Sequence, residues 1–120
     1  MACYSVANIK GRSSSGGVLG QTNRETVVIA CYHAKGNVTG EQSRIGGVIG
    51  WNYGKVTACY WENNQGQGIG DNQAGTGETT KVTDGDWQTA VDAMNAALSG
   101  KGWQYELKDG NSLPALKKEQ

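Results

Sequence analysis

The chain has 120 residues, the length of one domain, and its formal net charge is zero, from 11 basic and 11 acidic residues. This balance removes the usual electrostatic argument for nucleic acid as a partner. No apolar run approaches the ~18 residues of a membrane-spanning helix, so we expect no membrane insertion. Glycine is abundant, with 19 residues against one proline and no phenylalanine, which is typical of short strands and many turns.

The first element in chain order is a recurring motif. Ala2-Cys3-Tyr4 returns as Ala30-Cys31-Tyr32 and again as Ala58-Cys59-Tyr60, 28 positions further on each time. The first copy follows Met1 directly, with no basic and apolar leader before it. We therefore expect the sequence to be a piece of a longer chain.

A glycine motif recurs between these copies. Two copies, 30 positions apart, read Gly16-Gly17-Val18-Leu19-Gly20 and Gly46-Gly47-Val48-Ile49-Gly50. We interpret each copy as one strand of a repeating unit, and residues 27–32 and 55–60 as the other strand. The small difference between the two spacings indicates loops of unequal length between fixed strands.

A unit of about 28 residues cannot bury its own apolar face and must stack on its neighbours. Equivalent strands then pair in parallel, and the recurring residues form two rows: Cys3, Cys31 and Cys59, and Tyr4, Tyr32 and Tyr60. The expected fold is mainly β, a short parallel β-solenoid with about 28–30 residues per coil. Three sequential antiparallel hairpins are the alternative, which we favour less because the recurring residues match by identity.

The alternation of side chains along residues 27–32 predicts which face is buried. Val28, Ala30 and Tyr32 share one face, and Ile29 and Cys31 share the other. We expect the first set to line the interior, with the residues 28 positions later in the same orientation. A bulge at the cysteine would exchange the two faces.

At these residues the sequence resembles the GLUG-repeat family, named for a Gly-Leu-(apolar)-Gly core. Residues 17–20 and 47–50 match that core with conservative replacements, and residues 56–61 resemble the strand that follows it. The match covers roughly residues 1–70. The resemblance implies a right-handed β-solenoid in large bacterial surface or secreted proteins, which include adhesins and IgA-specific peptidases with accessory repeats.

The periodicity changes after about residue 80, which divides the domain into solenoid repeats (residues 1–82) and a C-terminal cap (residues 83–120). Apolar residues from Trp87 to Leu98 follow helical spacing. Asp84 or Asp86 can cap the start of this helix, and Gly100 can end it.

A hairpin is predicted to follow the helix, with residues 103–107 as a strand, Asp109-Gly110 as a turn and residues 113–116 as the return. We expect the helix and hairpin to cover the open end of the last coil, since exposed strand edges invite aggregation. The N-terminal edge has no such cover, which predicts self-association through that edge.

The sequence offers little chemistry. The three cysteines fall in one phase of the recurrence and are expected to be buried, with one disulfide between stacked neighbours as the alternative. They lack the C-x-x-C spacing of a zinc site, and His33 is the only histidine. The glycines of residues 66–70 are interpreted as a flexible loop. We therefore predict no metal ion, no cofactor and no catalytic residue, and the chain is expected not to be an enzyme.

Trp51, Tyr53 and Trp61 lie near predicted strand ends and turns, where exposed rings can stack on sugars or protein partners. With the resemblance, they predict an adhesion module on a bacterial surface, or in an extracellular protein, that binds an unidentified protein or glycan on a host or neighbouring cell. The competing interpretation is that these rings pack at solenoid corners or under the cap. The chain is then a structural spacer or accessory repeat region of a larger secreted protein such as an IgA-specific peptidase.

Overall fold

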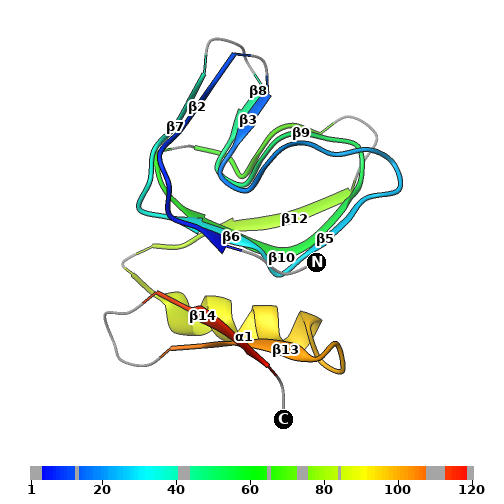
Figure 1. The fold of residues 1–120 in the computed structure, drawn as a ribbon, viewed down its shortest axis with the longest axis vertical. Coiled ribbons are helices and arrows are strands. Elements are labelled where there is room, and N and C mark those ends of the chain that lie inside the picture. The colour runs from blue at the N-terminus through cyan, green and yellow to red at the C-terminus, as the bar shows by residue number, and fades with distance from the viewer. Residues whose placement is uncertain are drawn as a thin grey trace.

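The computed structural model describes residues 4–12, 14–40, 44–64, 66–72, 76–83, 85–107 and 113–118, with only the backbone for residues 76–78. Cys3, Asp84 and the predicted turn at Asp109-Gly110 lie outside the described residues. The described part is mainly short strands with one helix (Figure 1). In chain order the elements are β1 (Tyr4–Ser5), β2 (Ile9–Gly11), β3 (Ser14–Gly16), β4 (Leu19–Gln21), β5 (Val27–Ile29), β6 (Tyr32–Ala34), β7 (Val38–Gly40), β8 (Arg44–Gly46), β9 (Ile49–Asn52), β10 (Lys55–Glu62), β11 (Ile69–Asn72), β12 (Thr76–Lys81), α1 (Trp87–Ala97), β13 (Trp103–Glu106) and β14 (Ala115–Lys118).

Strands 28 to 30 positions apart in the sequence lie side by side and run in parallel. Tyr4 of β1 pairs with Tyr32 of β6, and Tyr32 pairs with Tyr60 of β10. The strand pairs β2–β7, β3–β8 and β4–β9 are parallel as well. In Figure 1 the paired strands nearly superimpose, because the view runs along the direction of stacking. The prediction of a mainly β fold with parallel pairing is confirmed, and these strands do not form sequential antiparallel hairpins.

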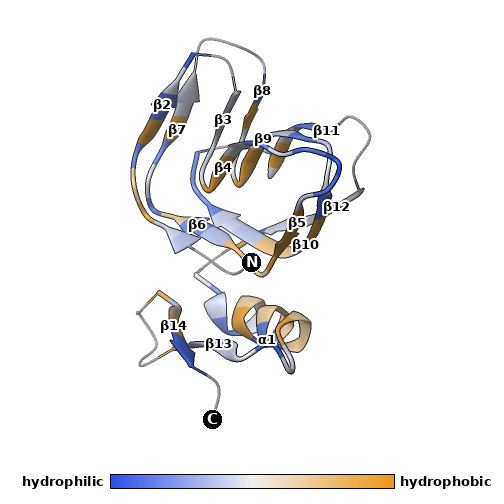
Figure 2. Cartoon of the chain, turned by 45° about the vertical axis from the view of Figure 1, so that its right-hand side comes forward, coloured by the Kyte–Doolittle hydropathy of each residue, from blue (hydrophilic) through white to orange (hydrophobic). Residues whose placement is uncertain are grey.

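The inner core lies between the sheet β1-β6-β10-β12, which also includes β5, and the sheet β4-β9-β11. Its apolar strands are visible in Figure 2, most clearly β4, β5 and β9. Strands β2, β3, β7 and β8 extend away from this core and form what we call the lobe (Figure 1). The buried residues of the inner core are Val28, Cys31, Val48, Ile49, Val56, Cys59 and Trp61.

A bulge exchanges the two faces of the longest sheet. Ala30 and Ala58 have φ angles of 56° and 51°, a left-handed conformation that is uncommon for alanine. Beyond each bulge the alternation restarts, so Cys31 faces the inner core and Tyr32 faces away from it. The expectation that Ala30 and Tyr32 line the interior is therefore wrong, whereas Val28 does lie inside.

The glycine motif is a bend between two strands, and the prediction of a single strand there is wrong. β3 and β8 end at the first glycine of each copy, and β4 and β9 begin two residues after the second. A Cβ atom on Gly17 would lie 2.4 Å from Cγ of His33, and a Cβ on Gly47 would lie 2.4 Å from Cγ of Trp61. The chain bends inward until its backbone rests on these two rings, which excludes any side chain at either glycine.

On the C-terminal side of the lobe, the side chain of Asn64 bonds to the backbone of β7. The backbone N–H of Val38 in β7 donates to Oδ1 of Asn64 at 2.9 Å, and Nδ2 of Asn64 donates to the carbonyl of Val38 at 3.2 Å. The amide of Asn64 therefore pairs with β7 in the way that the backbone of a further strand would.

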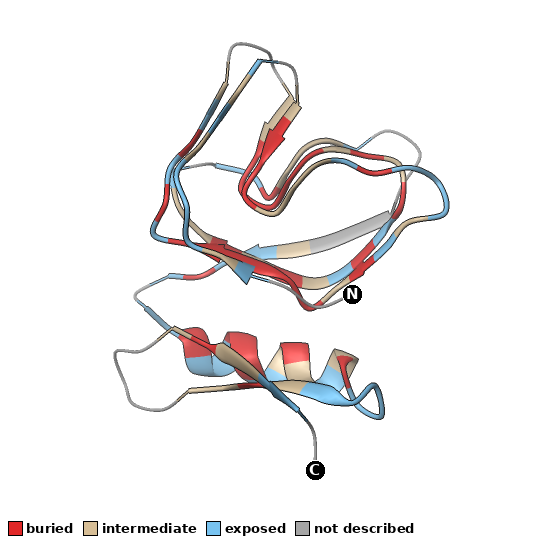
Figure 3. Cartoon of the chain, viewed as in Figure 1, coloured by how far each residue is buried: buried red, intermediate tan, exposed pale blue. Residues whose placement is uncertain are grey.

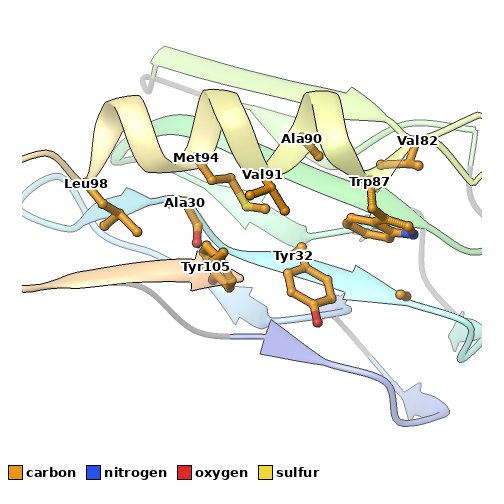
Figure 4. Packing of buried hydrophobic residues seen from close by; sticks show 10 residues of the cluster. Ala30, Tyr32, Val82, Trp87, Ala90, Val91, Met94, Leu98 and Tyr105 are labelled. Atoms are coloured by element: carbon orange, nitrogen blue, oxygen red, sulfur yellow. Dashed lines mark hydrogen bonds between the residues drawn. The ribbon is translucent and has the colours of Figure 1, made fainter. Parts of the chain in front are cut away.

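The helix and the hairpin of β13 and β14 form a layer against the outward face of the sheet that contains β6 (Figures 3 and 4). A second apolar cluster, which we call the outer core, lies between this layer and the sheet. In it the ring of Tyr32 lies 4.8 Å from that of Trp87 and 5.7 Å from that of Tyr105, centroid to centroid. The hydroxyl of Tyr105 donates to the carbonyl of Ala30 at 2.5 Å, and the hydroxyl of Tyr32 donates to the carbonyl of Pro114.

The position of this layer differs from the expected cover over the open end of a coil. The bulges turn Tyr32 outward and so create a second apolar face, which the helix buries with Trp87, Val91 and Met94. Asp86 caps the helix by accepting from the backbone N–H of Thr89 at 3.3 Å.

Candidate functional site

Two of the three predicted ligand-contact aromatics lie together. Trp51 on β9 and Tyr53 just after it are half-buried, and their ring centroids are 5.0 Å apart at an interplanar angle of 55°. Trp61 is 6% exposed and belongs to the inner core, beneath Gly47. The prediction of Trp61 as a ligand contact is therefore wrong, because no ligand can reach its ring without opening the core.

Polar side chains accompany Trp51 on the neighbouring strands. Gln21 of β4 and Asp71 of β11 are its register partners on either side. The guanidinium carbon of Arg44 lies 3.7 Å from the centroid of the Trp51 ring. We call the group Gln21, Arg44, Trp51, Tyr53 and Asp71 the Trp51 surface. It combines two aromatic rings, a guanidinium, a carboxylate and an amide on three adjacent strands and the edge of the lobe.

A row of buried polar groups lies behind this surface. The hydroxyl of Thr22 donates to Oδ1 of Asn52 at 2.5 Å, and Nδ2 of Asn52 donates to Oδ1 of Asn72 at 2.9 Å. The hydroxyl of Thr22 also accepts from the backbone N–H of Tyr53 at 3.0 Å. Because Asn52 is fully buried, these bonds hold the backbone beside Tyr53 in one conformation.

This polar row was not predicted, although the sequence contains a signal for it. Residues 19–22, 49–52 and 69–72 share the pattern (Leu/Ile)-Gly-x-(Thr/Asn). The third copy follows the second by 20 positions instead of 30, so it does not match the longer period. The interpretation of residues 66–70 as a flexible loop is wrong for Ile69 and Gly70, because β11 begins at Ile69 and pairs in parallel with β9.

The reactive side chains of Cys31, Cys59 and His33 are buried. Cys31 and Cys59 are fully buried thiols that donate to the carbonyls of Ile29 and Thr57, and no disulfide joins them. His33 is also fully buried: Nε2 donates to the carbonyl of Ala7 at 2.7 Å, and Nδ1 accepts from the side-chain amide of Asn63 at 2.9 Å. Both ring nitrogens are thus engaged, which leaves His33 unable to act as a base toward Cys31.

Within the described ranges, no three or more His, Cys, Asp and Glu side chains gather closely enough to hold a metal ion. The helix α1, with 11 residues, is too short to cross a membrane. Among the described residues, no helix is long and apolar enough to do so. Comparison of the chain with models of protein families, with curated proteins and with solved structures gave no match.

Proposed function

We propose that the chain is a non-catalytic binding module of β-solenoid type from a bacterial surface or secreted protein, and that it binds its partner through the Trp51 surface. The resemblance to GLUG repeats supports the class of protein. The parallel pairing of β1, β6 and β10 in matching register supports the solenoid, since stacked coils pair in this way.

The observation that carries the proposal is the half-buried aromatic pair of Trp51 and Tyr53 beside polar side chains. Aromatic rings contact the apolar faces of sugars and of protein side chains, and neighbouring amide and carboxylate groups supply directional hydrogen bonds. The buried row behind the surface holds the backbone of Tyr53 in one conformation before any ligand arrives, which lowers the entropic cost of binding.

The lack of catalysis is supported by the environment of the reactive groups. Cys31 and His33 are both fully buried, and the hydrogen bonds of His33 tie it to Ala7 and Asn63. A nucleophile and its base must be reachable by substrate and must contact each other. The first condition is not met, because Cys31 and His33 are fully buried.

A structural spacer is the second candidate, and the cover over Trp51 favours it. The guanidinium of Arg44 lies over the ring at 3.7 Å, so that ring face cannot stack on a sugar unless Arg44 moves aside. Strands that stack in parallel also make stiff rods, which suits a spacer. On this reading the Trp51 surface contributes stability alone.

The deciding experiment displays the domain multivalently on beads and probes it with an array of host glycans and matrix proteins. Trp51→Ala and Tyr53→Ala are compared with the parent chain, and Trp103→Ala serves as the matched control. Trp103 is 50% exposed but lies on β13, away from the Trp51 surface. Binding that is lost in the first two variants and kept in the control supports the binding module. A parent chain that binds nothing on the array favours the spacer.

The purified chain, free in solution, tests the predicted self-association through the N-terminal edge. Tyr4 and Val27, on the edge strands β1 and β5, are 46% and 48% exposed. We propose that they bring two chains together edge to edge. Sedimentation velocity over a range of concentrations should then show a dimer that Val27→Lys abolishes.

A further inference from the structure

We infer that Arg44 makes the Trp51 surface selective for glycans that carry a carboxylate, such as those with uronic or sialic acid residues. This inference rests on the proposed function and specifies its ligand. Arg44 is held on two sides at the surface and still presents hydrogen-bond donors to solvent.

Two contacts fix the guanidinium of Arg44. It lies over the ring of Trp51, with the guanidinium carbon 3.7 Å from the ring centroid. Its Nε donates to Oδ2 of Asp71 at 3.3 Å. Stacking on an aromatic face and a hydrogen bond at Nε leave the guanidinium little rotational freedom, so binding a ligand costs little further entropy.

The terminal nitrogens of Arg44 remain as donors. A guanidinium has five N–H groups in one plane, and only Nε has a partner among the residues that the structure describes. The side chain is 40% exposed. The two Nη atoms match the spacing of the two oxygens of a carboxylate, which they bind in a bidentate manner.

The surroundings favour a sugar acid over an acidic peptide. The ring of Tyr53, 5.0 Å from that of Trp51, offers an apolar surface near the guanidinium, and the amide of Gln21 lies in register on the other side of Trp51. Sugar rings present apolar C–H faces and hydroxyls side by side, and this combination of aromatic and amide groups suits both.

Asp71 limits how the site recognises charge. Its carboxylate lies beside the guanidinium with 28% of its side chain exposed, so the pair as a whole is nearly neutral. Long-range attraction of any anion is therefore weak. Selectivity has to come from the geometry of the two Nη donors, which distinguishes a carboxylate from a neutral hydroxyl.

The test measures binding of the intact chain on beads to two matched pairs of probes. The pairs are sialyllactose with lactose, and oligogalacturonate with its methyl ester. Within each pair the acidic probe should bind, and the uncharged probe should bind at least tenfold more weakly, since a charge-assisted bidentate pair is worth roughly a ten- to hundredfold change.

Variants then assign the effect to Arg44. Arg44→Gln should remove the preference for the acidic probe, and Arg44→Lys should keep only part of it, because an ammonium group cannot form the planar fork. Lys101→Gln makes the same change of charge on an exposed residue after helix α1 and should leave binding unchanged. Near-ultraviolet circular dichroism confirms that each variant is folded.

The outcomes separate this inference from the proposed function. Equal binding of acidic and uncharged probes by the parent chain keeps the binding module but overturns the role of Arg44. Binding only to matrix proteins on the array overturns the assignment to glycans. No binding to any probe or array ligand overturns the proposed function and the inference with it.

Discussion

Gly47 lies against Trp61 so closely that a Cβ atom at position 47 would be 2.4 Å from Cγ and Cδ1 of the indole. The contact closes the inner core beneath the bend that follows β8. Trp61 cannot move away, because it is 6% exposed and packed among the other residues of the inner core. The glycine is therefore required by the absence of space and not by its backbone angles.

Gly47→Ala should lower the free energy of unfolding by about 3 kcal/mol, because overpacking a dense core forces side chains from their rotamers. Urea unfolding followed by tryptophan fluorescence measures the change. Gly66→Ala is the control, since a Cβ at that position meets no atom within 4 Å. Equal stability of the two variants would show that the bend does not rest on Trp61.

Ala58 tests the bulge. Its φ of 51° is open to glycine and costly for branched residues. Ala58→Val should destabilise the fold by about 2 kcal/mol or more, whereas Ala58→Gly should stay within about 0.5 kcal/mol of the parent chain, because relief of strain offsets the added entropy of the unfolded state. Thermal unfolding provides the comparison. A valine tolerated as well as glycine would contradict the left-handed conformation.

Asn52 tests the buried polar row. Its side chain bonds to Thr22 and Asn72 and, through both of its polar atoms, to the backbone of Gly54. Asn52→Ala leaves several buried groups without partners and should cost about 3 kcal/mol, since each such group costs about 1–3 kcal/mol. Asn72→Ala, at the exposed end of the row, should cost less than about 1 kcal/mol in the same urea titration. Similar losses of unfolding free energy in both variants would contradict the greater cost expected at the buried Asn52.

The buried phenol of Tyr32 should make the free energy of unfolding fall at alkaline pH. Burial, and to a lesser extent the nearby Tyr4, raise the pKa of the Tyr32 phenol above its ordinary value of 10.0. The folded protein therefore holds this proton more tightly than the unfolded chain. The resulting stability is complete below pH ~10 and is lost as the pH rises above that value toward the raised pKa.

Urea titrations between pH 8 and 11 should thus show a falling free energy of unfolding in the parent chain. Tyr32→Phe should be less stable near pH 8 by about 1 kcal/mol, because it loses the bond to Pro114, but its stability should fall less steeply. Parallel curves for the parent and Tyr32→Phe would rule out Tyr32 as the titrating group.

Recurrence in the sequence was enough to predict the parallel partners of the strands. Tyr4, Tyr32 and Tyr60 do lie in register, because coils of constant length place identical residues side by side when they stack in parallel. The face of each residue was harder to predict. A single bulged residue reverses the alternation, and alanine carries no signal for positive φ, so Ala30 and Ala58 read as ordinary strand residues.

The candidate site was predictable only in part. Trp51 and Tyr53 are near neighbours in the sequence, so their proximity was easy to foresee, but Arg44 reaches Trp51 from the edge of the lobe. Trp61 shows the opposite error. Its place at the end of a predicted strand suggested exposure, but the glycine bend that covers it is formed by residues 14 positions earlier.

The amide of Asn64 beside β7 has a consequence for how such chains can diversify. Ile49 and Ile69 are paired neighbours only 20 positions apart, because the connection between β10 and β11 omits the lobe and Asn64 satisfies the backbone of Val38 instead. The lobe is therefore an optional insertion that evolution can add to or remove from a coil while the inner core is preserved.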